Sequence, residues 1–171
     1  MKQAIDNHIE KLLKIIKGLG TFEPTPTTSR QALAETFKCD IKSEYFLYII
    51  RTDFMDSKVI LKQFRQFKDK NKESYKLSSI NELDKFNGVL YVGSSASLDS
   101  RLNQHLGHTG KRVYSLQLNQ WFKKITEVEI EIIPINETYF DILYPLENAL
   151  WDYHRPLFGK KGTNVNSSRH T

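Results

Sequence analysis

The stretch from Gly88 to Leu106, GVLYVGSSASLDSRLNQHL, decides the fold. Its first part, Val89–Val92, is an apolar run of strand length that Gly93 ends. Several serines then offer N-caps to a helix, in which leucines spaced four apart form one stripe and Gly107 is a stop signal. The stretch therefore predicts a core strand that leads directly into an amphipathic helix.

Other segments also carry the patterns of strands and helices. The aromatic and apolar run YFLYIIR predicts a strand over 45–51, and acids that alternate with aliphatic residues predict another over 127–135. Helical patterns cover part of 58–76 and the segments 113–125 and 139–153, and Pro145 either kinks the last one or restarts it. The predicted class is α/β (α+β), a small central mixed or antiparallel sheet flanked by helices.

The chain has 171 residues, a length that suits one domain with a small appendage. Residues 2–17 have the apolar period of an amphipathic helix, a Pro/Thr linker follows, and 30–37 is a short second helix by pattern. We therefore expect an N-terminal helical extension over 1–40 and a main domain over 41–171. The apolar face of the first helix could build a homodimer.

Positive charge is concentrated in a few segments. The chain has 25 Lys+Arg against 20 Asp+Glu, a net charge of +5, and seven basic residues with only two acids lie between Lys58 and Lys76. This stretch belongs to a basic insertion at about 54–87, and its charge favours a polyanion such as DNA, although solvated surface lysines are the alternative. We expect the following residues to contact nucleic acid: Lys62, Arg65, Lys68, Lys111, Arg112, Lys160 and Lys161.

Composition and motifs exclude several classes of protein. The single cysteine rules out a disulfide scaffold and a cysteine-based zinc cluster. No apolar run approaches the roughly 20 residues of a membrane span, and the charged N-terminus is not a signal peptide, so we expect a cytoplasmic protein. The chain contains no phosphate-binding glycine loop of the Walker or dinucleotide type and no serine-centred nucleophile elbow.

Arg101 and His105 are the first candidates for chemistry. They are four residues apart on the predicted helix and flank its leucine stripe, so we expect them on one helix face at the edge of the buried surface. There an arginine can bind a phosphate and a histidine can help to move a proton. The alternative is an ordinary exposed pair.

Glu147 and two tyrosines are the other candidates. Glu147 falls on the apolar stripe of 139–153, where a carboxylate is costly unless it is paired or binds a metal. Glu147 either forms a structural salt bridge with an arginine, or it has a functional role as a metal ligand or as a general acid/base. Tyr48 and Tyr91 each lie within a predicted core strand, where the hydroxyl needs a partner unless the ring is simply packed.

Together these residues resemble the GIY-YIG nuclease family over about residues 44–160. Tyr91-Val92-Gly93 stands for the second half of the family signature, and Phe46-Leu47-Tyr48 for the first. Arg101 and His105 follow Tyr91 at the family's spacing, and a later helix carries Glu147 ahead of the run HRPLF. Small stand-alone bacterial members look similar, and insertions within the compact core are typical of restriction-type members.

The resemblance implies a DNA endonuclease with one divalent metal, Mg²⁺ or Mn²⁺. It implies that Tyr48 and Tyr91 point into one site, where one of them, with or without His105, takes or relays the proton of the attacking water. It also implies that Arg101 binds the scissile phosphate and that Glu147 holds the metal. This division of roles is consistent with the charge that phosphodiester hydrolysis develops.

The chain departs from the family at three points, which keeps a second function open. Phe46 stands where the family has its first Gly, the two tyrosines are far apart in sequence, and Gly159 stands where the family commonly has Asn, with Asn164 the nearest one downstream. These departures motivate a catalytically degenerate nucleic-acid-binding module as the alternative. A structural protein that uses its N-terminal helix is a third reading, but it leaves Glu147 unexplained.

Overall fold

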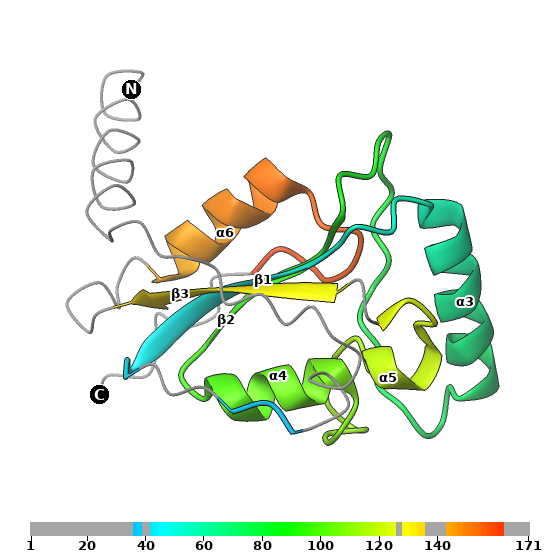
Figure 1. The fold of residues 1–171 in the computed structure, drawn as a ribbon, viewed down its shortest axis with the longest axis horizontal. Coiled ribbons are helices and arrows are strands. Elements are labelled where there is room, and N and C mark those ends of the chain that lie inside the picture. The colour runs from blue at the N-terminus through cyan, green and yellow to red at the C-terminus, as the bar shows by residue number, and fades with distance from the viewer. Residues whose placement is uncertain (1–35, 39–41, 126–127, 136–142, 163–171) are drawn as a thin grey trace.

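A three-stranded antiparallel sheet in the order β2-β1-β3 forms the centre of the molecule (Figure 1). The computed structural model describes residues 36–38, 42–125, 128–135 and 143–162. The elements, in chain order, are β1 (Tyr45–Thr52), α3 (Ser57–Lys70), β2 (Val89–Ser95), α4 (Leu98–Leu106), α5 (Leu118–Trp121), β3 (Val128–Ile135) and α6 (Leu143–His154).

β1 is apolar and aromatic up to Ile50 because it is the central strand and both of its faces are covered. Phe46, Tyr48 and Ile50 face one side of the sheet, and Leu47 and Ile49 face the other. β3, an edge strand, instead alternates acidic with aliphatic side chains and tolerates a proline. The predicted sheet is thus confirmed in its antiparallel form.

Helices cover both faces of the sheet. In Figure 1 α6 lies over one face, α4 and α5 lie under the other, and α3 stands at one end. The larger core cluster fills the side of α3, α4 and α5, and two smaller clusters lie beneath α6. Because β2 is an edge strand, residues from the layers above and below it can meet at its outer edge, where, among the described residues, the segment after α6 bonds only to Val89 and Leu90 of the strand.

The insertion between β1 and β2 is folded onto the domain. Its helix α3 begins at an Asp56 side chain that accepts the Val59 N–H, and it buries Ile60 and Phe64 in the larger core cluster. The segment after α3 forms a bridge from Leu77 to Ser115 and a second one from Ile80 to Phe158. The insertion is therefore attached to the loops before α5 and after α6.

The helix predicted over 113–125 is wrong, since only α5, a single turn, is helical there. The backbone of Ser115 instead pairs with Lys76 and Ser78 of the insertion. Gln117 has a left-handed φ of 55°, which no α-helix can continue through. The apolar periodicity arises because Leu116, Leu118 and Trp121 are buried, and it does not indicate a helix here. The backbone pairs with the insertion instead.

Some of the remaining predictions concern segments that lie partly or wholly outside the described residues. The N-terminal helix over 2–17 lies outside them, and in the helix predicted over 30–37 only residues 36 and 37 are described and neither is helical. Pro145 lies in the first turn of α6, a position that accepts proline without a kink. The division into 1–40 and 41–171 stays a prediction. None of the described helices is long and apolar enough to cross a membrane.

Candidate active site

Arg101 on α4 connects the two tyrosines of the sheet. Its Nε donates to the Tyr48 hydroxyl at 3.2 Å, and its Nη2 donates to the Tyr91 hydroxyl at 3.3 Å. A third bond at 3.0 Å, from Nη1 to Gln104 on the next turn, holds the guanidinium plane. The structure therefore places Tyr48, Tyr91 and Arg101 in one cluster.

His105 completes this cluster from beneath and is fully buried, so the expectation that it lies at the edge of the buried surface is wrong. Its Nε2 lies 3.2 Å from the Tyr48 hydroxyl, and its Nδ1 accepts the backbone N–H of Leu116 at 3.3 Å. An Nδ1 that accepts leaves the ring proton on Nε2, which then donates to Tyr48. The Tyr48 oxygen thus faces two donors, His105 and Arg101.

Burial sets the protonation of the cluster. It raises the pKa of Tyr48, helped by Tyr91 and opposed by the Arg101 charge, and it likewise raises the pKa of Tyr91. Burial and the Arg101 charge together hold the pKa of His105 well below its usual range. At neutral pH both tyrosines are therefore phenols and His105 is neutral. Burial by itself would lower the pKa of Arg101. The two tyrosine oxygens beside the guanidinium have the larger effect, so the pKa of Arg101 is raised.

Two glycines let the tyrosines take these positions. A Cβ on Gly93 would stand 2.5 Å from the Tyr48 hydroxyl, and one on Gly159 would stand 2.6 Å from a Tyr91 ring carbon. Gly159 also has a φ of +94°, which favours glycine over every other residue. A glycine at position 159 is therefore required by the packing of Tyr91.

Glu147 reaches the edge of β2 from α6, in the opposite layer. Its Oε2 accepts a short hydrogen bond from the Ser94 hydroxyl, and Ser94 directly follows Gly93. Burial raises the pKa of Glu147, while the Ser94 bond and the Arg101 charge oppose this. Among the described residues no arginine forms an ion pair with Glu147, which disfavours its role as a structural salt bridge.

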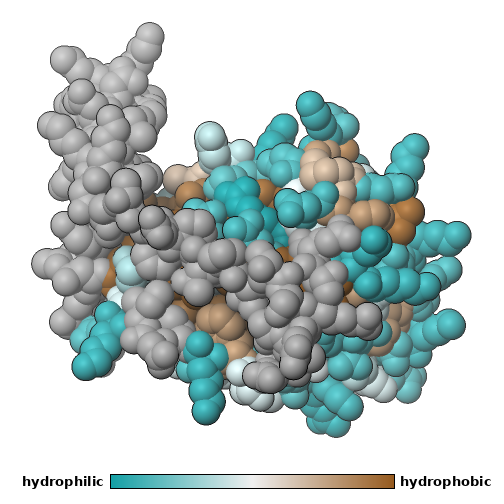
Figure 2. All heavy atoms as spheres, in the orientation of Figure 1, coloured by the Kyte–Doolittle hydropathy of each residue, from teal (hydrophilic) through white to brown (hydrophobic). Residues whose placement is uncertain are grey.

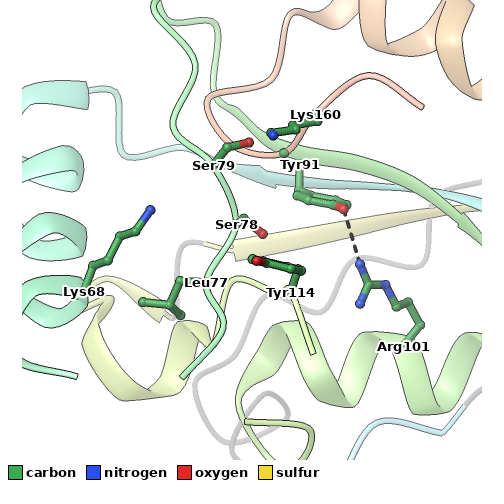
Figure 3. Close-up of a pocket in the computed structure, with 9 residues that line it drawn as sticks. Lys68, Leu77, Ser78, Ser79, Tyr91, Arg101, Tyr114 and Lys160 are labelled. Atoms are coloured by element: carbon green, nitrogen blue, oxygen red, sulfur yellow. Dashed lines mark hydrogen bonds between the residues drawn. The ribbon is translucent and has the colours of Figure 1, made fainter. Parts of the chain in front are cut away.

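An open cleft of about 480 Å³ lies beside this cluster (Figure 3). Tyr91 and Arg101 form one part of its wall, Lys68, Ser78 and Ser79 come from the insertion, and Tyr114 and Lys160 come from two loops. The cluster thus opens onto a surface that the insertion helps to build.

The basic residues that the sequence singled out divide into groups. Lys68 and Lys160 line the cleft. Lys62 and Arg65 are exposed on α3, and Lys111 and Arg112 are exposed in the loop before α5. Lys161 is paired with Asp152. Figure 2 shows hydrophilic side chains gathered over the end of the molecule where α3 lies.

Sequence reasoning missed several residues of this region. Ser94 and Gln104 orient Glu147 and Arg101, and Asn81 of the insertion donates to the carbonyls of Pro156 and Gly159. The position of Ser94 directly after the strand glycine was an available signal. The sequence also carried a signal for Tyr114, since it is an aromatic residue close to the basic pair Lys111-Arg112. It carried no signal for Asn81, because the hydrogen-bond partners of Asn81 lie 75 and 78 positions away.

Comparison with known proteins agrees with this geometry. The sequence model of the GIY-YIG catalytic domain matches residues 44–161, most of the chain. No curated protein and no solved structure matches significantly. The fold and the site define a nuclease-type catalytic domain. The chain belongs to the GIY-YIG family.

Proposed function

We propose that the protein is a metal-dependent endonuclease that hydrolyses phosphodiester bonds of DNA through Tyr48, Tyr91, Arg101, His105 and Glu147. The observation that carries the proposal is the position of Arg101. Its guanidinium contacts both tyrosine hydroxyls and lines a cleft that also has two lysines. A bound phosphodiester needs such a fixed cation against its oxygens.

Arg101 retains donors for a substrate. A guanidinium has five N–H groups, and the bonds to Tyr48, Tyr91 and Gln104 use three of them. The other two are available to the scissile phosphate, whose negative charge grows as water attacks the phosphorus. Arg101 then stabilises that charge without leaving Tyr91.

Tyr48 is the residue that we assign as proton acceptor. Two donors on its oxygen favour the phenolate once it forms, whereas the Tyr91 oxygen has one side-chain donor. His105 already carries its proton on Nε2, so it stabilises this phenolate and does not act as the base. The Tyr48 oxygen is covered in this structure, so the attacking water has to reach it when the substrate binds, with the Arg101 Nε–H still donating to that oxygen.

The oxygens around Glu147 suit Mg²⁺ or Mn²⁺. Glu147 Oε1 and Asn148 Oδ1 lie 4.0 and 3.3 Å from the point where a Cβ on Gly162 would stand, and Oδ1 is buried without a hydrogen-bond partner. In the described residues no group of three acidic, His or Cys side chains could hold a metal. Mg²⁺ is commonly bound by one carboxylate with water and substrate phosphates. Glu147 would hold the ion, which when bound supplies positive charge against the leaving oxygen.

Cleavage of supercoiled plasmid, with Mg²⁺ or with EDTA, tests the proposal. We expect wild-type cleavage with Mg²⁺ only, none by Glu147→Gln, and unchanged cleavage by Asp152→Asn, which alters an exposed carboxylate on the same helix. Discrete products would add site specificity of the restriction type. Salt-sensitive binding without cleavage of plasmid, single strands or RNA would overturn the proposal and favour the degenerate binding module. Formation of a homodimer also stays a prediction.

A further inference from the structure

The cleft beside Arg101 has features that the chemistry above does not use. The proposed reaction needs Tyr91 and Arg101, yet most of the cleft wall comes from elsewhere. Lys68, Ser78 and Ser79 belong to the insertion, and the loops before α5 and after α6 add Tyr114 and Lys160. A volume of about 480 Å³ lies within the range of pockets that enclose a small organic molecule.

Two cations and a free hydroxyl make part of this wall suitable for a phosphate. Within the described part of the chain, neither Lys68 nor Lys160 forms an ion pair with a carboxylate. The Ser79 hydroxyl is buried and has no hydrogen-bond partner there. A buried donor without a partner is costly, and an anionic acceptor would remove that cost.

Tyr114 adds an aromatic surface to the same cleft. Its side chain is 64% exposed, although a tyrosine ring would bury much apolar area if it packed. The Lys76 ammonium lies 5.8 Å from its ring centroid. In Figure 3 Tyr114 and Tyr91 both line the opening, with Arg101 beside them.

We propose that this cleft binds one DNA nucleotide next to the scissile phosphate, with its base turned out of the helix stack. Tyr114 stacks on the base, and Lys68, Lys160 and Ser79 bind the adjoining phosphate. A base inside a duplex has both faces covered by its neighbours, so an aromatic ring can contact its face only after it leaves the stack. The proposal rests on the proposed nuclease function and adds an unpaired nucleotide to its substrate.

The test measures binding in EDTA, so that it does not depend on cleavage. The probes are a fluorescein-labelled DNA duplex with one bulged nucleotide and the matched perfect duplex, followed by fluorescence anisotropy. We expect the wild type to prefer the bulged duplex and Tyr114→Ala to lose about tenfold in affinity for it, as loss of one stacked base does. Tyr114→Phe keeps the ring and the preference. Tyr153→Ala is the matched control, because Tyr153 is an exposed tyrosine on α6 that does not line the cleft.

A second readout tests the lysines. With 2-aminopurine at the bulge, stacking on Tyr114 changes the fluorescence of the base when wild type binds. We expect Lys68→Ala to weaken this change, and Lys58→Ala to keep it, because Lys58 is exposed on the same helix but does not line the cleft. Circular dichroism confirms that each variant is folded.

Specific results would overturn the inference. Equal affinity of wild type for the bulged and perfect duplexes would do so, and so would a Tyr114→Ala variant that binds the bulge like wild type. Equal effects of Lys68→Ala and Lys58→Ala would show that the lysines act only through their general positive charge. Plasmid cleavage by wild type alongside any of these results would leave the nuclease proposal intact. Absent cleavage with bulge-specific binding would reject the nuclease proposal, and with it the place of the nucleotide next to a scissile phosphate, but not the binding of an unpaired nucleotide in the cleft.

Discussion

At the scale of single residues, the hydrogen bonds of His105 determine its part in the site. From the residue types alone, a histidine near an arginine and a tyrosine would be expected to act as a general base. The Leu116 N–H on Nδ1 makes His105 a donor instead, and burial keeps the ring neutral. A backbone contact eleven positions away thus separates two roles that the sequence left open.

The pH dependence of cleavage follows from the tyrosine pKa. Burial raises the pKa of Tyr48, so its phenolate is scarce at neutral pH and becomes more abundant as pH rises. We expect kcat to rise about tenfold per pH unit on the alkaline side of neutrality, because the reactive form is the deprotonated one. Steady-state cleavage of a labelled duplex at several pH values measures this.

Tyr48→Phe is the control for that profile. It removes the oxygen but keeps the packed ring, so we expect the activity to fall strongly at every pH. A wild-type profile that is flat, or that falls with rising pH, would reject Tyr48 as proton acceptor.

Gly159 permits a prediction about the Asn that the family resemblance leads one to expect at this position. We expect the substitution Gly159→Asn to lower both stability and activity. A left-handed φ and a Cβ 2.6 Å from the Tyr91 ring together cost about 1–3 kcal/mol and displace Tyr91. Thermal unfolding and kcat measure the two effects, and a rise in activity would contradict the packing argument.

At the scale of elements, the contact between β2 and α6 holds Glu147. Ser94 donates to the carboxylate and so opposes the rise in its pKa that burial causes. Substitution Ser94→Ala removes this bond, so a larger fraction of Glu147 is protonated at a given pH. A protonated carboxyl is a poor metal ligand, so we expect Ser94→Ala to need more Mg²⁺ than wild type, most clearly at acidic pH.

Mg²⁺ titrations of cleavage at two pH values measure this difference. The matched control is Ser95→Ala, because the Ser95 hydroxyl accepts the Ser97 N–H and does not contact Glu147. A Ser94→Ala variant with the Mg²⁺ dependence of wild type would show that the bond does not support metal binding.

At the scale of the whole molecule, the insertion turns a compact domain into one with a basic surface. Its helix presents Lys62 and Arg65 to solvent and Lys68 to the cleft. We expect the triple alanine variant of these residues to bind duplex DNA more weakly. Each phosphate contact that is lost should also make the negative slope of log affinity against log salt shallower by about 0.9.

Fluorescence anisotropy at several salt concentrations measures that slope. Lys161→Ala is the comparison, because Asp152 already pairs with this lysine, and we expect it to change the slope less. If the triple variant keeps the wild-type affinity and slope, the insertion does not bind the DNA backbone.

Local patterns were sufficient for much of the sheet and for α4. The start of β2 at Val89, the helix that Gly107 ends and the apolar central strand could be predicted because each depends on neighbours within a few residues. The predicted end of the strand at Gly93 was wrong, because pairing with β1 continues β2 to Ser95. The same patterns failed over 113–125. There the apolar periodicity correctly indicates that side chains are buried. The segment is not a helix, however, because its backbone pairs with the insertion almost 40 positions earlier.

The sequence by itself determined which residues are candidates for the chemistry: two strand tyrosines, an arginine and a histidine one helical turn apart, and a glutamate on an apolar stripe. Only the tertiary structure decided how they act together. It set the tautomer of His105, joined Ser94 to Glu147 across 53 positions and placed Tyr114 and Lys68 in the wall of one cleft. The physical reason is that periodicity encodes which face of an element is buried, whereas the partner of that face is chosen by the packing of the whole chain.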